Sequence, residues 1–294
     1  MLAVLSPERA MVADPRTGAT WARRLPGGTF CHGPLLSIGD RVVVSGWRGR
    51  HPIALSLPLD LTGRPRSLGP AETITASSTP GRVWLGHWAR PRTWTNTGRV
   101  RGSLREVDAA GRPVARIALR VRPWGGLEAA VDDGFLFDAQ RGLSLQRRGS
   151  ATRTFRDAWL VATGGSRLAW CRGGCRRLRI WSPDGERALD LPAGIRPSPG
   201  WRAAFSPDGS RLAAPVRSRG RDRVAVTDLT SGTWRLVPGR LTGYRSVAWS
   251  PSGRWLYFTG AHDRVLAWSG GRPVRLPIHT GGAVMSIATT ALPH

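Results

Sequence analysis

The C-terminal half of the chain repeats one sequence pattern three times, and this repeat restricts the possible folds more than any other feature. Each copy has a short apolar run, a turn ending in glycine, and a second apolar run that begins with leucine three residues later. The glycines are Gly165, Gly209 and Gly253, so successive copies are 44 residues apart. Such spacing between short strands and tight turns indicates a fold built from small, similar sheets.

A period of this length is typical of a β-propeller, in which each blade is a four-stranded antiparallel sheet. Seven periods of about 42 residues give about the full length of 294 residues. We therefore predict an all-β chain that forms a single seven-bladed β-propeller over residues 1–294. The expected blades are 1–28 together with 283–292, then 33–70, 72–122, 125–157, 159–195, 200–240 and 243–281.

The two ends of the chain are expected to share one blade. The first predicted blade has three strands and lacks an innermost one. Residues 285–290 resemble the predicted inner strand at 245–250, and no second strand follows them. Pairing of this last strand with the first blade would close the ring and remove open sheet edges, which otherwise invite aggregation.

Aspartates recur in the expected turns between the outer strands of the blades. Examples are Asp14, Asp60, Asp108 and Asp228, each followed by glycine within four residues. An Asp side chain accepts hydrogen bonds from backbone N–H groups of such a turn, and glycine adopts the positive φ that the turn needs. We therefore interpret these carboxylates as turn formers and not as catalytic acids.

Two segments, Phe205–Ala214 and Trp249–Phe258, resemble the WD-like propeller repeats of TolB-type proteins and of the propeller domains of prolyl-oligopeptidase-family enzymes. The motif fits the sixth and seventh predicted blades well, the fifth in part, and the others only by spacing. The resemblance implies a propeller fold and, as in many bacterial members, an extracytoplasmic or interaction role. The chain lacks the N-terminal domain of TolB, a hydrolase domain and a Gly-x-Ser-x-Gly motif.

The formal net charge of +25 would ordinarily suggest a nucleic-acid or other polyanion partner. However, all 44 basic residues are arginine, and the chain has one asparagine, Asn96. This bias is typical of a GC-rich bacterial genome, and the arginines are scattered along the chain. We therefore expect mostly solvated strand faces. A polyanion-binding protein is an alternative that requires the arginines to gather on one face.

Cys171 and Cys175 flank a short turn, Arg-Gly-Gly, between the expected second and third strands of the fifth blade. Residues that face each other across a hairpin lie at disulfide distance, so we predict a disulfide. Free thiols and a metal pair are the alternatives. A disulfide indicates an oxidising compartment, and hence the cell envelope, although the chain begins without a signal peptide; a cytoplasmic location is the alternative. No apolar run is long enough to span a membrane.

Aromatic residues recur just before the predicted inner strands. They are Trp124, Trp159, Trp201 and Tyr244. Such residues either pack between blades or form an aromatic rim around the axial pocket. Polar residues predicted on the same face are His32, Arg202, Arg245 and His279. We take these eight residues as the candidate binding face.

The predicted inner strands carry small, hydroxylic and apolar residues, without paired carboxylates or a histidine cluster. We therefore predict a non-catalytic binding or scaffolding module that works as a monomer without a cofactor. Its partner would be a protein, a peptide or a glycan, and nucleic acid is not expected. The alternative is a propeller enzyme, a hydrolase or lyase, with at least two acids or a histidine within hydrogen-bond reach at the axial pocket.

Overall fold

The computed structural model describes most of the chain. The described residues are 1–6, 8–26, 29–88, 100–121, 127–131, 134–139, 142–147, 151–164, 166–182, 184–197, 202–241, 246–260, 264–278, 284 and 286–289. They form two compact units: unit 1 comprises Met1–Arg24 and Trp159–His294, and unit 2 comprises Leu25–Ala158.

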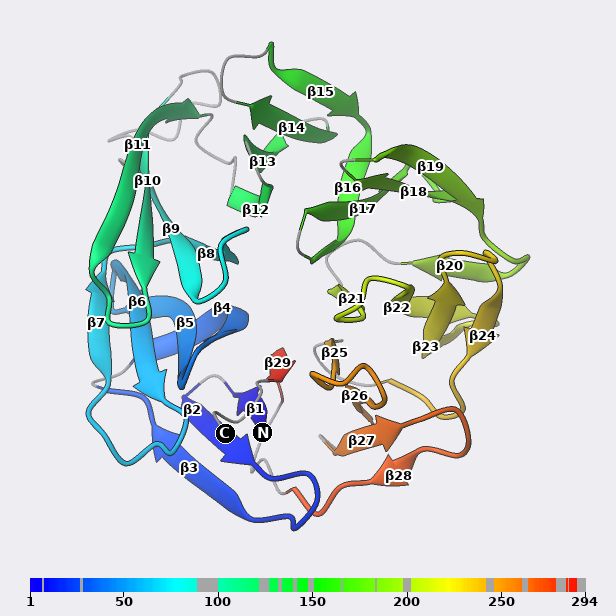
Figure 1. Cartoon of the computed structure of the whole chain (residues 1–294), viewed down its shortest axis with the longest axis horizontal. Helices are drawn as coiled ribbons and strands as arrows, with labels where there is room; N and C mark the ends of the chain where they lie inside the picture. The colour runs from blue at the N-terminus through cyan, green and yellow to red at the C-terminus, as the bar shows by residue number, and fades with distance from the viewer. Residues whose placement is uncertain are drawn as a thin grey trace. The chain divides into compact units, whose positions relative to one another are not determined.

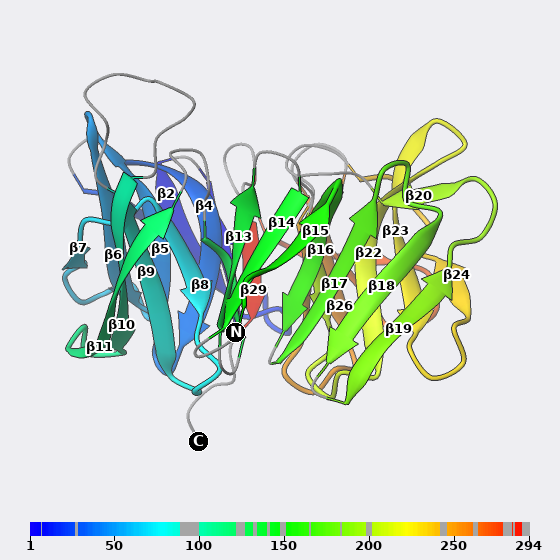
Figure 2. The same cartoon turned by 90° about the horizontal axis from the view of Figure 1, so that it is seen from above.

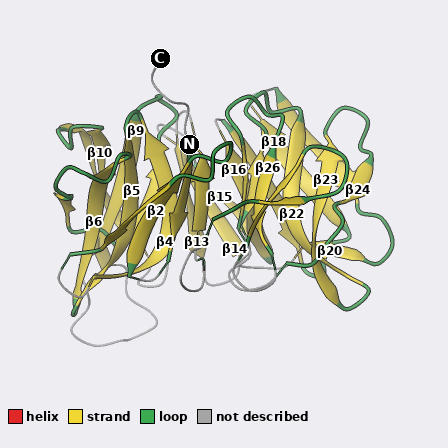
Figure 3. Ribbon diagram, turned by 90° about the horizontal axis from the view of Figure 1, so that it is seen from below, coloured by secondary structure: helices red, strands yellow, loops and turns green. Residues whose placement is uncertain are grey.

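Both units are built from β-strands, and no helix occurs among the described residues, as Figure 3 shows. Consequently no helix in this part of the chain could cross a membrane. The strands of unit 1 are β1 (Leu2–Leu5), β2 (Arg9–Ala13), β3 (Thr20–Arg24), β16 (Ala158–Gly164), β17 (Arg167–Arg172), β18 (Arg177–Ser182), β19 (Gly185–Asp190), β20 (Ile195–Pro197), β21 (Ala203–Phe205), β22 (Arg211–Ser218), β23 (Arg221–Asp228), β24 (Trp234–Leu236), β25 (Val247–Trp249), β26 (Leu256–Thr259), β27 (Val265–Trp268), β28 (Val274–Arg275) and β29 (Ser286–Thr289).

In unit 1 the strands pair mainly with their sequence neighbours, which gives up-and-down sheets. The orders are β29-β1-β2-β3, β25-β26-β27-β28, and a nine-stranded sheet that runs β19-β18-β17-β16-β21-β22-β23-β24, with β20 beside β22. Figure 2 shows β17, β18 and β19 side by side. The nine-stranded sheet is two antiparallel sets joined by a short parallel pairing of Ala162 with Ala203.

The last described strand lies beside the first. β29 pairs antiparallel with β1, with Leu2 opposite Thr289 and Leu5 opposite Ser286, where the sequence predicts such a pairing. In Figure 1 the red β29 and the blue β1 meet at the chain ends. All four residues of β1 are buried, which explains why this short apolar segment needs a partner strand on each side.

The sequence repeat of unit 1 encodes contacts between successive sheets. The Arg211 guanidinium lies 4.5 Å from the ring centroid of Trp249 and donates a 2.6 Å hydrogen bond to the carbonyl oxygen of Gly253. Arg167, at the equivalent place in the preceding copy, lies against Gly209. Gly209 and Gly253 both have φ of +68°, a conformation that side chains disfavour. The repeated glycine and arginine therefore connect successive repeats at these two places.

Unit 2 contains three four-stranded antiparallel sheets, in the orders β4-β5-β6-β7, β11-β10-β9-β8 and β12-β13-β14-β15. The innermost strand β8 lies beside both β4 and β12. The strands are β4 (Thr29–Ile38), β5 (Arg41–Arg48), β6 (His51–Pro58), β7 (Arg66–Gly69), β8 (Thr73–Ala76), β9 (Arg82–Trp88), β10 (Val100–Asp108), β11 (Pro113–Val121), β12 (Leu127–Val131), β13 (Gly134–Ala139), β14 (Gly142–Arg147) and β15 (Arg153–Arg156).

One segment of unit 2 departs from the sequence prediction. The expected blades leave residues 29–32 between them, but Cys31 and His32 belong to β4, where Cys31 is opposite Gly46. A register shift between Cys31 and Leu35 lets β4 continue past its apolar core segment. Bulges of this kind extend a strand while interrupting its regular pairing.

The turn aspartates have the structural role that the sequence predicts. Asp14 accepts a 2.9 Å hydrogen bond from the backbone N–H of Arg16, and Asp228 accepts one of the same length from Thr230. Asp60 and Asp108 make equivalent bonds. The backbone hydrogen bond from Arg16 is the main reason that the pKa of Asp14 lies below its usual value. These carboxylates are therefore bound to their own turns.

Candidate functional site

The candidate site is a groove of about 380 Å³ in unit 1. Its walls come from the β16 strand, the loop between β17 and β18, strand β20, and the turn between β22 and β23. The side chains that define its chemistry are Trp159, Arg196, Arg217 and Arg219, and glycines supply much of the remaining wall. We call this site the arginine groove.

A disulfide fixes the loop on one side of the arginine groove. Cys171 and Cys175 are bonded, with their Cα atoms 5.1 Å apart, which confirms the pairing predicted from the sequence. The backbone N–H of Cys175 donates a 2.9 Å hydrogen bond to the carbonyl oxygen of Arg172 and closes the turn. Both cysteines are buried in the core of unit 1. Gly173, at the tip, has φ of +47°, so glycine suits this position.

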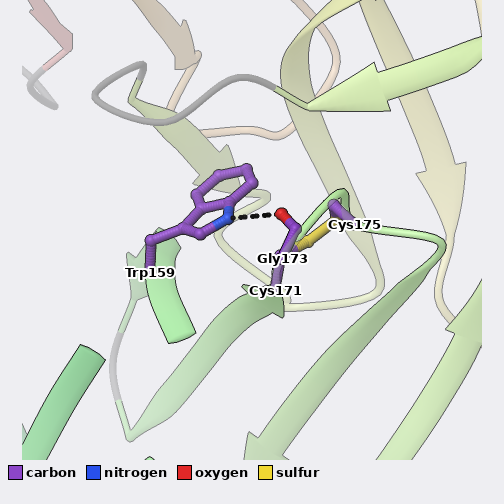
Figure 4. Close-up of a disulfide and its surroundings, with 4 residues drawn as sticks. All are labelled: Trp159, Cys171, Gly173 and Cys175. Carbon is purple, nitrogen blue, oxygen red and sulfur yellow. Dashed lines mark hydrogen bonds between the residues drawn. A yellow bond between two sulfur atoms is a disulfide. The ribbon is translucent and has the colours of Figure 1, made fainter. Parts of the chain in front are cut away.

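Trp159 joins the inner strand to this loop. It lies within β16 and is half-buried, and its indole Nε1–H donates a 3.5 Å hydrogen bond to the carbonyl oxygen of Gly173. Figure 4 shows the indole directed toward the disulfide loop. The ring also packs against the core of unit 1. Trp159 therefore packs against the core of unit 1 and also lines the arginine groove.

The opposite side of the groove is formed by the short strand β20 and the end of β22, which bring like charges together. β20 pairs antiparallel with β22, and in this register Arg196 is directly opposite Arg217. The β22–β23 hairpin turns at Arg219 and Gly220, whose φ values are +49° and +72°. Positive φ at both central residues is typical of a type I′ hairpin, and arginine is uncommon there.

The lining of the groove carries an excess of positive charge. No carboxylate is among its described lining residues, and within the described chain Arg196, Arg217 and Arg219 make no ion pair. All three side chains are exposed. Elsewhere in unit 1 exposed arginines form ion pairs. For example, Arg177 Nε lies 2.7 Å from Asp190 Oδ1. The groove therefore presents three cationic groups and one indole to a partner.

Most of the other residues predicted on the binding face fall outside the description. Trp124, Trp201, Tyr244, Arg245 and His279 lie outside the described residues, as does the side chain of His32. Arg202 is described and exposed. Its backbone makes an isolated parallel bridge with Ser246, and it does not line the arginine groove.

Sequence reasoning missed three of the four side chains that define the groove. Arg196, Arg217 and Arg219 could not be distinguished among 44 arginines. A weak signal existed at Ser218-Arg-Gly-Arg221, where glycine between two polar, strand-like segments is typical of a tight hairpin. No comparable signal marked β20.

Unit 2 contains a polar arrangement of a different kind. Glu72, just before β8, has its Oε2 atom 3.0 Å from His87 Nδ1, and the same oxygen accepts a 3.0 Å hydrogen bond from the backbone N–H of Trp88. Glu72 Oε1 is buried without a hydrogen-bond partner in the described structure. A carboxylate beside an imidazole orients the ring and can support proton transfer.

Comparisons with known proteins place the fold. No family model matches the chain, and no curated protein matches it in sequence. Among solved structures, apo AztD from Citrobacter koseri superposes with a TM-score of 0.55 at 13% identity, covering 98% of this chain and 96% of that chain. A nidogen/laminin complex gives a TM-score of 0.53 at 14% identity, with the same coverage.

A third similar structure is acylaminoacyl peptidase in complex with Z-Gly-Gly-Phe-chloromethyl ketone. It gives a TM-score of 0.63 at 9% identity over 93% of this chain, but the match covers only 48% of the peptidase chain. The all-β sheets of this chain and the folds of these similar structures lead to the same conclusion. The fold is that of a β-propeller. At such low identity the likeness concerns architecture alone, and the TolB-type resemblance stays a prediction.

Proposed function

We propose that this chain is a non-catalytic binding propeller whose arginine groove holds an anionic segment of a protein partner. The observation that carries the proposal is the cross-strand pair of Arg196 and Arg217, which are directly opposite each other and form no ion pair within the described chain, although Asp222 is opposite Arg217 on β23. Like charges directly opposite one another destabilise a sheet. A bound carboxylate between them would remove this penalty and gain charge-assisted hydrogen bonds.

The other walls of the groove fit the same partner. Arg219 extends the cationic surface from a rigid two-residue turn, and Trp159 offers an indole beside it. Tryptophan and arginine are the residues that most often dominate binding energy at protein interfaces. The disulfide between Cys171 and Cys175 holds the facing loop in place, so less entropy is lost on binding.

The wider architecture belongs to the same proposal. We take the chain as one closed ring of seven blades over residues 1–294, completed by the pairing of β29 with β1, and working as a monomer without a cofactor. The disulfide supports an extracytoplasmic location. The presence of a nidogen/laminin complex among similar structures supports protein binding as a use of this fold. Size-exclusion chromatography with light scattering tests the monomer.

The test of the groove is a double variant, Arg196→Gln with Arg217→Gln. Binding is measured by calorimetry with oligoglutamate as a peptide probe and oligogalacturonate as a glycan probe. We expect the double variant to bind oligoglutamate about tenfold more weakly, because two charge-assisted contacts are lost. The matched control, Arg272→Gln with Arg275→Gln, removes the same charge from exposed positions elsewhere in unit 1 and should bind as the parent does.

Each outcome separates the candidate partners. Equal loss of affinity in the control would show that net charge, and not the groove, governs binding, as expected of a general polyanion binder. Tight binding of oligogalacturonate with none of oligoglutamate would replace the peptide by an acidic glycan. Absence of binding by both probes would overturn the proposal.

The runner-up function is a propeller enzyme, and one observation favours it. Glu72 and His87 place an acid and an imidazole within hydrogen-bond reach near the start of β8. His87→Ala should leave oligoglutamate binding unchanged if the chain is a binding module. Hydrolysis of a chromogenic ester by the parent that disappears in His87→Ala would favour the enzyme.

A further inference from the structure

Unit 2 contains a second and larger cavity, of about 830 Å³, between the β8–β11 sheet and the β12–β15 sheet. Its volume lies within the range of small-molecule sites, which is about 300–1,000 Å³. We call this space the seam cavity. It shares no lining residue with the arginine groove, so it is an independent candidate site.

The seam cavity follows from unequal strand lengths. β10 and β11 have nine residues each, whereas β14 has six and β15 has four. The inward residues of β11, Ala115, Ile117 and Leu119, alternate with exposed ones as a half-buried strand requires. They remain only partly buried because the short outer strands of the facing sheet do not cover them completely.

A buried carboxylate belongs to the wall of the cavity. The Glu106 side chain is 8% exposed, although an ionised carboxylate is costly to bury. Glu106 Oε1 accepts a 2.6 Å hydrogen bond from Ser77 Oγ, and Oε2 lies 3.5 Å from the Arg82 guanidinium. A carboxylate offers about four acceptor sites, so one short and one long contact leave it under-satisfied. Within the described residues Glu106 makes no other polar contact.

Aromatic groups stand beside this carboxylate. The rings of Trp84 and Phe135, one from each sheet, pack edge to face with centroids 4.9 Å apart and an interplanar angle of 83°. Both residues line the cavity. An aromatic wall with an anionic group suits an organic cation, because ring faces attract positive charge and the carboxylate accepts its N–H groups.

Two arginines also line the cavity, and their charge would favour an anion. However, Arg116 and Arg147 are both exposed, so water and salt screen them. Exposed ion pairs contribute less to binding than hydrogen bonds to a buried charged group do. The buried Glu106 therefore has more influence on the ligand than the two exposed guanidiniums.

We infer that the seam cavity binds a small organic cation, namely an amine on an apolar or aromatic skeleton, with the ammonium at Glu106 and the skeleton against Trp84, Phe135 and Ile117. The class is defined by chemistry: one to three N–H donors for the carboxylate and an apolar body for the cavity wall. The site is a binding site, without a chemical step.

The experiment compares three probes with one skeleton and different heads: phenethylamine, phenethyl alcohol and hydrocinnamate. Calorimetry on the full chain should show binding of the amine at least about tenfold tighter than of the alcohol, and little binding of the carboxylate. Glu106→Gln keeps the shape of the side chain and should remove the preference for the amine. Glu8→Gln, an exposed position in unit 1, removes the same charge as a control.

A second pair of variants tests the place of binding without removing a charge. Ala115 is directly opposite Glu106 on the neighbouring strand, so Ala115→Phe would place a ring in the cavity on the same face of the sheet. Ala118→Phe adds the same ring to the exposed face of β11. The first should abolish amine binding and the second should not.

The inference would be overturned by equal binding of amine and alcohol, by preference for hydrocinnamate, or by unchanged amine binding in Ala115→Phe. Absence of amine binding by the folded parent protein, with its β-sheet circular dichroism intact, would overturn it as well.

Discussion

Neighbouring sheets pack through different side-chain contacts in the region from β16 to β28 and in the two sheets from β8 to β15. In the first region Arg167 lies against Gly209 of the next repeat and Arg211 donates a hydrogen bond to Gly253 of the one after it. Trp249 Nε1–H also donates a 3.0 Å hydrogen bond to the carbonyl oxygen of Ala204. In the second region Trp84, Trp88, Phe135 and Phe137 meet edge to face, and the seam cavity remains beside them.

The difference shows what a sequence repeat contributes to packing. Where contact residues recur, adjacent repeats pack through the same contacts. Where they vary, large aromatic rings fill part of the space and the remainder is left open. Residues in the regular region should therefore carry more stability per side chain, while the irregular region has room for a ligand.

The largest expected effect is the replacement of a leucine in the regular region. Leu212→Ala removes a side chain that is 0% exposed, and we expect a loss of about 3 kcal/mol. Ile117→Ala, beside the seam cavity, should cost about 1 kcal/mol, because the residue is half-buried and its removal enlarges an existing space. Urea denaturation of both variants measures the difference. Equal losses would mean that the two regions are packed alike.

Removal of the disulfide should have the next largest effect. It closes a loop of five residues, so the loop-entropy relation gives about 2 kcal/mol for Cys171→Ala with Cys175→Ala. The change should also weaken oligoglutamate binding, because the loop that holds the Gly173 carbonyl oxygen near Trp159 becomes mobile. Thiol titration of the denatured parent protein, before and after reduction, checks the bond. Amine binding to the seam cavity should not change.

A smaller effect is expected from the arginine that joins two repeats. Arg211→Ala removes the contact with the Trp249 ring and the hydrogen bond to Gly253, and we expect a loss of about 1.5 kcal/mol. Arg254→Ala, an exposed position in the following turn, should change the unfolding free energy by less than about 0.5 kcal/mol. Similar values for both variants would show that the repeated contact adds no stability.

The smallest effect concerns acid sensitivity. Hydrogen bonds from Ser206 and Ser210 lower the pKa of Asp208 to about 2, from a usual value of 3.8. Because the pKa in the folded protein is lowered, the stabilisation is present above pH 3.8 and is lost as the pH falls through about 2. Asp208→Ser introduces the residue type that the next repeat has at this place, Ser252. It should reduce the change of the unfolding free energy with pH in this range. Unfolding measured at pH steps between these values checks it.

The sequence predicted the strands that the repeat marks because apolar alternation and turn residues are local signals. It predicted the pairing of Ser286–Thr289 with the first strand because the first blade lacked an inner strand and residues 285–290 resembled one. β20 was missed because Ile195-Arg-Pro197 is too short for a pattern and contains proline. The seam cavity was missed because it depends on the relative lengths of β11 and β15, which no single segment encodes. The disulfide was predictable from spacing, whereas the facing arginines required the register of β20 on β22.

The sheet that joins β29 to β1 has a consequence for synthesis. β1, β2 and β3 are synthesised before the other described strands, whereas β29, the inner partner of β1, is synthesised after all of them. Until then the buried residues of β1 have an open edge, which can pair with another chain. Contacts so distant in sequence also form slowly. The nascent chain therefore exposes an aggregation-prone strand edge throughout its synthesis. A chaperone that covers Leu2–Leu5 would raise the yield of folded protein.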